Sequence, residues 1–274
     1  MNESARKLSE TKKETQSTDY RKVGFWQLLV LVLLLNFVVQ AIHEGGHWIV
    51  YETAGRGPVW GFIGLVQSWD EPPLHPNEWI ERIAPDGARG WERFASAPSK
   101  TEDILGLIAG PLASLLGVVL GLSLMRFNRN PTLKQMGLVL ALITSFIMSQ
   151  YYLRGFSRTG GDEYFLAGLL GIPKYIIDIP FCVAFITGFI LGIWSLGNWQ
   201  TRLKWLGTIL LGSLPAGIFL VIADGIVRSQ ANQDNALFQP LLGVSLPVIA
   251  INVVVVLALW TWWKQANKSI MIQY

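Results

Sequence analysis

Charged side chains are scarce in this 274-residue chain: they make up 15% of it, against 51% hydrophobic residues, and the mean hydropathy is +0.38. This balance is typical of a polytopic membrane protein and excludes an ordinary soluble domain with one core. The net charge of +3 is too small and too dispersed to indicate a nucleic-acid partner. A single cysteine, Cys182, excludes an intrachain disulfide, and its apolar surroundings indicate a small core residue.

Long apolar runs take the place of the missing charges. The first run has about twenty residues without a charge, which is enough to cross a bilayer. The sequence therefore predicts an all-α polytopic membrane protein with about six transmembrane helices and a loop rich in Gly, Pro and Trp after the first helix. The expected spans are residues 23–42, 104–125, 133–153, 175–196, 205–227 and 241–263.

The chain divides by composition into three parts. Residues 1–22 form a polar tail that we expect to precede a retained membrane helix, not to be a cleaved signal peptide. Residues 23–170 form a membrane core that includes an interfacial loop, 51–103, and residues 171–274 supply the C-terminal transmembrane helices. Within the loop, the glycine-broken runs of residues 55–66 suggest a hairpin or a re-entrant element, and the tryptophans that follow favour a membrane interface.

Basic residues are more frequent in alternate loops and in the tail. This bias predicts an amino terminus on the inner side and places loop 51–103 outside. We therefore expect an integral multi-pass protein, and the cell membrane as its location.

The first apolar run ends in five residues that carry chemistry, His43-Glu44-Gly45-Gly46-His47. Positions i and i+4 of a helix lie on one face, so both imidazoles can reach one point while Glu44 flanks it. The pattern H-E-x-x-H is a zinc hydrolase signature, because zinc takes neutral imidazole ligands and keeps a position for water, which the carboxylate can deprotonate. The three side chains could instead be solvated, but ionisable residues that continue a membrane helix favour a functional site. The two glycines either admit a neighbouring backbone or a substrate, or serve ordinary small-residue packing.

A third metal ligand is expected among the later carboxylates. Asp162 and Glu163 follow two glycines at the start of an apolar run, where the acids could alternatively complement a helix dipole. Asp224 ranks second, because it could also be a solvated acid or a partner for Arg228 one turn on. His75 falls between prolines in the loop, where a histidine is more often simply exposed.

These motifs together resemble the site-2 protease family of intramembrane zinc metalloproteases. The likeness covers residues 30–170: the 43–47 motif, then residues 109–114 (Ala-Gly-Pro-Leu-Ala-Ser) in the second apolar run, then a Gly-Asp pair that opens a later helix. The proline and glycine at 110–111 mark a kink or a close approach. The family usually has Asn where this chain has Ser114, and Asp-Gly where this chain has Gly-Gly-Asp-Glu.

The resemblance also implies a chemistry. It implies Zn²⁺ as cofactor, with His43, His47 and Asp162 as metal ligands and Glu44 as the catalytic base. The implied substrate is a membrane protein or peptide that is cleaved within the lipid bilayer after local unwinding. Many members of the family place the zinc nearer the cytosol, which is the opposite of the orientation that the loop charges indicate.

Two other functions stay open. A non-enzymatic metal-binding transporter or scaffold would use the same four side chains as an ion site, since acids at membrane depth and broken helices also occur in transporters. No pair of halves with matching interruptions is apparent in the sequence. A relative that keeps the fold without turnover would bind structural zinc, although a structural site does not need the base Glu44.

Overall fold

The computed structural model describes residues 24–157 and 159–271, so the polar tail 1–22 lies outside the described residues. The protein is an all-α polytopic membrane protein. Within the described ranges, six helices are long and apolar enough to cross a membrane. They are α2 (Phe25–Thr53), α3 (Lys100–Phe127), α4 (Pro131–Gly155), α6 (Tyr175–Ser195), α7 (Trp199–Asn232) and α8 (Leu246–Met271).

The prediction of six spans is confirmed, but several of the predicted ends are wrong. Helix α2 includes the 43–47 motif, as expected, but continues to Thr53, beyond the motif at which the sequence predicted its end. Helix α7 begins at Trp199, because the side chain of Asn198 caps it, and not at residue 205. The last helix begins at Leu246 and not at 241. Hydropathy locates the apolar centre of a helix, while polar caps and short strands decide where it ends.

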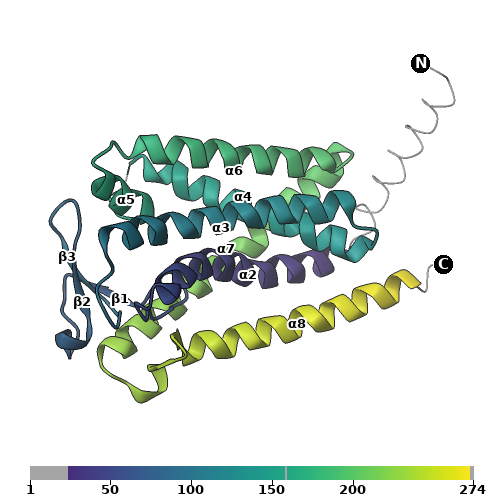
Figure 1. Cartoon of the computed structure of the whole chain (residues 1–274). Helices are drawn as coiled ribbons and strands as arrows, with labels where there is room; N and C mark the ends of the chain where they lie inside the picture. Colours follow the sequence, from purple (N-terminus) through teal and green to yellow (C-terminus); the bar gives the residue numbers. More distant parts are fainter. Residues whose placement is uncertain (1–23, 158, 272–274) are drawn as a thin grey trace.

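The long helices lie side by side, with α3 between α2 and α4 (Figure 1). Helix α6 packs on α4, and α7 packs on α2. The largest buried cluster joins α2, α4 and α7 through side chains such as Leu28, Leu138 and Trp205. Cys182 is buried in a second cluster with Tyr152 and Phe185, as expected for a small core residue. Helices α2 and α4 are therefore joined both by direct packing and through α3.

A small antiparallel sheet fills the loop between α2 and α3. Its strand order is β1 (Gln67–Trp69), β3 (Arg89–Glu92), β2 (Ile80–Ile83), so β1 is an edge strand. A 3₁₀ turn, η1 (Pro76–Glu78), precedes β2. Trp79, which we expected at the membrane interface, is buried in a cluster with side chains from α7 such as Leu220. Neither this sheet nor the burial of Trp79 was expected from the sequence.

The predicted hairpin at 55–66 is present as a tight turn within residues 59–66. The Val66 amide donates to Val59 O over 2.8 Å, and the Gly61 amide donates to Gly64 O over 2.9 Å. The short helix α5 (Asp162–Leu170) also lies at this end of the molecule. The 3₁₀ turn η2 (Ala236–Phe238) is followed by the strand pair β4 (Pro240–Leu241) and β5 (Val244–Ser245). The sheet and α5 lie at the same end of the long helices (Figure 1).

Candidate metal centre

Helix α2 presents the two histidines of the motif on one face. His43 and His47 are four residues apart, both are buried, and their Nε2 atoms lie 3.3 Å from each other. Their rings meet nearly edge to face, with an interplanar angle of 81°. The helical spacing therefore directs both imidazoles at one point, as the sequence predicted.

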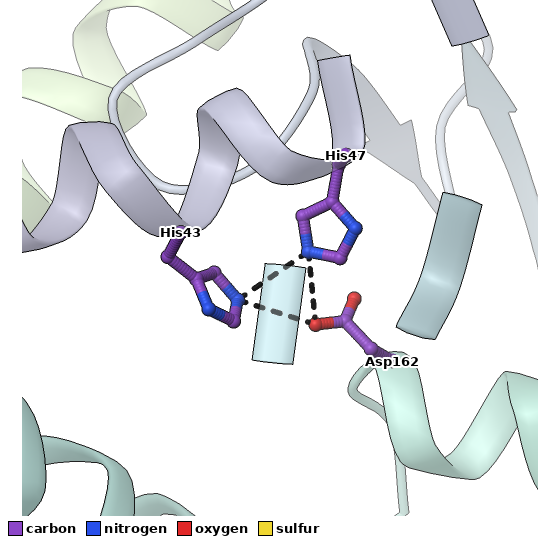
Figure 2. A group of neighbouring side chains, drawn as sticks. All are labelled: His43, His47 and Asp162. Atoms are coloured by element: carbon purple, nitrogen blue, oxygen red, sulfur yellow. Dashed lines mark hydrogen bonds and ion pairs between the residues drawn. The ribbon is translucent and has the colours of Figure 1, made fainter. Parts of the chain in front are cut away.

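Asp162 reaches the same point from the first turn of α5. Its Oδ2 lies 3.4 Å from His43 Nε2 and 3.2 Å from His47 Nε2 (Figure 2). The three candidate ligand atoms all lie within 4.8 Å of one another. Burial alone would raise the pKa of the Asp162 carboxyl, but the two neighbouring histidine rings hold that pKa below its usual range. A carboxylate and two imidazoles that converge in this way form a donor set suited to zinc.

Helix α3 supplies a partner for the second nitrogen of each histidine. His47 Nδ1 lies 2.7 Å from the carbonyl oxygen of Gly106, which only accepts, so Nδ1 carries a proton, and in the neutral ring Nε2 has the lone pair that a metal would need. His43 Nδ1 lies 2.9 Å from Ser114 Oγ. Ser114 stands where the site-2 protease family usually has Asn. The sequence gave no signal that this hydroxyl would contact a histidine, because the contact depends on how α2 and α3 pack.

Close contact between α2 and α3 makes these bonds geometrically possible. A Cβ on Gly110 would overlap the imidazole ring of His47, so a residue with a side chain cannot occupy this position without moving the ligand. A Cβ on Gly46 would lie 2.5 Å from Ala109 O. Gly110 next to Pro111 is thus the close approach that the sequence predicted, and Gly46 admits a neighbouring backbone.

Glu44 lies in the same turn of α2 and is 3% exposed. Its Oε1 accepts a hydrogen bond of 2.6 Å from Gln40 Nε2. Its Oε2 has no hydrogen-bond partner among the residues that the structure describes. A buried carboxylate oxygen without a partner is costly, which is typical of a functional site. The arrangement leaves this oxygen free to accept a proton.

A buried polar chain fixes the start of α5. The Asp162 amide donates to Tyr151 Oη over 3.2 Å, and the Tyr151 hydroxyl donates to Glu163 Oε2 over 2.7 Å. Lys174 lies 3.2 Å from Glu163 Oε1 and also donates to Gly155 O. These contacts tie the third candidate ligand to α4 and to the start of α6. From the sequence, Glu163 was expected either as one of two carboxylates at the mouth of the membrane or as a partner of the helix dipole, and neither Tyr151 nor Lys174 was expected near it.

The other candidates lie outside this cluster. Asp224, the second choice for third ligand, is paired with Arg228, as the sequence also allowed, at a distance of 2.5 Å from Nε to Oδ2. His75 is exposed, and its Nε2 lies 3.9 Å from Asp234 Oδ2. Among the described residues, only His43, His47 and Asp162 form a group that could hold a metal ion.

Fold and site together define a multi-pass membrane protein in which two buried histidines and a partly exposed aspartate converge next to a buried glutamate. Comparisons with protein-family models, with curated proteins and with solved structures give no match to this chain. The resemblance to the site-2 protease family therefore stays a prediction from the motifs, and the function is argued from the site itself.

Proposed function

We propose that this protein is an intramembrane zinc metalloprotease of the site-2 protease kind, which hydrolyses peptide bonds of membrane-associated or transmembrane substrates. The observation that carries the proposal is the convergence of His43 and His47, on a helix long enough to span a bilayer, with Asp162 of α5, beside a Glu44 oxygen that has no hydrogen-bond partner among the described residues. A protein that only needs a structural metal does not need this extra buried base.

The residues present fit a zinc ion. The donor set is two imidazole nitrogens and one carboxylate oxygen, and the Gly106 carbonyl fixes His47 in the tautomer that a metal requires. Three protein ligands leave one position of a tetrahedral zinc site for water. When bound, the ion would supply a Lewis acid that acidifies this water and polarises the scissile carbonyl.

The chain's own residues would then move the proton. Gln40 holds one oxygen of Glu44 in place, so the other oxygen can accept a proton from water and pass it to the leaving amine. The buried surroundings strengthen such transfers because they exclude bulk water. The glycine-rich stretch 55–64 and the edge strand β1 after it are the candidate wall along which an unwound substrate could lie as an added strand.

Replacement of the base tests this proposal. Glu44→Gln keeps the shape of the side chain but cannot accept the proton, so cleavage of a membrane-embedded peptide by the purified protein should fall about a hundredfold to ten-thousandfold. Zinc content should stay unchanged. Glu52→Gln, an exposed position on the same helix, is the matched control and should leave cleavage intact.

Two results would remove the protease proposal. One is a Glu44→Gln variant that cleaves as fast as the unmodified protein. The other is metal-dependent flux through proteoliposomes that is lost on His43→Ala while no peptide is cleaved, which would favour the ion-transporting alternative.

A further inference from the structure

The turn at residues 59–66, here called the hairpin, lies beside the candidate base. Gly64 at its tip has φ +95°, and a Cβ built there would be 4.0 Å from Glu44 Oε2 and 3.4 Å from Arg228 Nη2. The hairpin tip thus faces the one Glu44 oxygen that has no hydrogen-bond partner among the described residues. Anything that moves the hairpin changes the surroundings of that oxygen.

Helix α7 holds the tip of the hairpin through two charged residues. Asp224 Oδ1 accepts hydrogen bonds from the amides of Phe62 and Ile63, at 3.0 and 2.8 Å. Arg228 Nη2 donates to the carbonyl oxygen of Ile63, and Arg228 Nε pairs with Asp224 Oδ2. The pair therefore satisfies three backbone groups of one turn: two amides and one carbonyl.

The far edge of the hairpin is also occupied. The Trp60 amide donates to Gly243 O over 2.9 Å, and the Ser245 amide donates to Trp60 O over 3.1 Å. The indole of Trp48 on α2 donates to the same Gly243 carbonyl. Residues 243–245, which lead into α8, thus hydrogen-bond to the side of the hairpin opposite β1.

The near strand of the hairpin leads towards the candidate metal ligands. Residues 65–66 continue into β1, whose outer edge pairs with no other strand in the part of the chain that the structure describes. Trp69 at the end of β1 packs on Phe165 of α5, with ring centroids 5.5 Å apart, one turn after Asp162. The strand thus runs from Glu44 at one end to α5 at the other.

An Asp-Arg pair within a membrane-spanning helix is costly to bury, so its retention needs a reason. The metal group does not use Asp224, and among the described residues the backbone groups that hydrogen-bond to the side chains of the pair belong to the hairpin tip. We propose that Asp224 and Arg228 are positioning residues: they hold the hairpin against Glu44 and so set the wall on which an extended peptide lies. This inference rests on the proposed protease function.

Two zinc-binding probes of different size test the inference. Acetohydroxamate contacts only the metal, whereas an apolar peptidyl hydroxamate binds the metal and lies along the wall. The affinity of both is measured on the detergent-purified, zinc-loaded full chain, for the unmodified protein, Asp224→Asn and Arg228→Gln. Glu81→Gln is the matched control, because it removes a comparable Arg-carboxylate pair, Arg89 to Glu81, on the exposed face of the sheet.

The two variants should bind the peptidyl hydroxamate at least about tenfold more weakly, because each loses hydrogen bonds that place the wall. Acetohydroxamate affinity should stay within about twofold, and the Glu81→Gln control should match the unmodified protein with both probes. In the same samples, the amides of residues 59–66 should exchange hydrogen at least about tenfold faster while those of α4 do not change.

Two outcomes would overturn the inference while leaving the protease proposal standing. One is unchanged affinity for the peptidyl hydroxamate in both variants. The other is an equal loss of affinity for both probes, which would mean general damage to the site. If the unmodified protein binds neither probe, it is the proposed protease function that fails.

Discussion

Each histidine of the candidate site is oriented by a single partner on α3. The partner of His47 is a backbone carbonyl, which no substitution can remove, whereas the partner of His43 is the hydroxyl of Ser114. Such partners fix ring orientation and tautomer, and their loss typically weakens metal binding. At the scale of single residues, the hydrogen bond between His43 and Ser114 is thus the one that a substitution can remove.

We expect Ser114→Ala to raise the dissociation constant for zinc about tenfold or more, because His43 loses the bond that orients its ring. Competition with a chromophoric chelator measures this constant. Ser149→Ala is the control: Ser149 is also buried, but its hydroxyl donates to the carbonyl oxygen of Ser145 in its own helix and to no candidate ligand, so zinc affinity should be unchanged. Equal affinities for all three proteins would show that the His43–Ser114 bond does not position a ligand.

At the scale of the elements, the site depends on how closely α2 and α3 pack. The contact is made by Gly46 on α2 and by Gly110 on α3. A Cβ added to either glycine would lie closer than ordinary contact distance to an atom of the other helix. Helices with small residues at the contact approach more closely than helices with larger ones. The helix pair therefore leaves no space that could absorb a new methyl group next to His47.

Gly110→Ala should abolish stoichiometric zinc binding, because the new methyl group would occupy the position of the His47 ring. Gly117→Ala, on the same helix, is the control: its Cβ would meet Ile42 at an ordinary 3.7 Å, so zinc binding should persist. Metal analysis of both purified variants gives the answer. Full zinc occupancy in Gly110→Ala would mean that His47 is not a ligand.

The long helices could be predicted from the sequence, and the short strands of the sheet could not. Long uncharged runs predict membrane helices by themselves, and the i, i+4 spacing predicts that His43 and His47 share a face. The sheet was missed because its strands have only three or four residues and carry charges, such as Arg89 and Glu92 in β3. The partners of the site, Ser114 and Tyr151, were missed because only tertiary packing, of α3 on α2 and of α4 on α5, brings them to the ligands.

At the scale of the whole molecule, two of the candidate ligands lie on α2 and the third lies on α5, far along the chain, and they meet only when both helices pack on α3. The unfolded chain has no such group. A metal ion that binds only the folded state stabilises it by mass action, and a free concentration of 1,000 times the dissociation constant contributes about 4 kcal/mol.

Removal of zinc with a chelator should therefore lower the melting temperature of the detergent-solubilised protein, and added zinc should restore it. The shift should vanish in Asp162→Ala, which lacks one ligand, and persist in Glu52→Gln, an exposed change on α2. Differential scanning fluorimetry measures the shift. A zinc-dependent shift of equal size in Asp162→Ala would place the metal elsewhere in the protein.

Acid should release the metal, because zinc binds neutral imidazole and protons compete for the same nitrogen. Zinc affinity should therefore be full well above the ordinary histidine pKa of about 6.5 and fall as the pH drops through and below it. Equilibrium dialysis at a series of pH values measures this dependence. Zinc affinity that stays constant down to about pH 5 would argue against histidine ligands.

Zinc content is the most direct test of the central claim that His43, His47 and Asp162 form a metal site. Mass-spectrometric metal analysis of the detergent-purified protein should find about one zinc ion per chain in the unmodified protein, in Glu44→Gln and in Asp224→Asn, and none in Asp162→Ala. Absence of zinc from the unmodified protein after zinc loading, or its full retention in Asp162→Ala, would contradict the account.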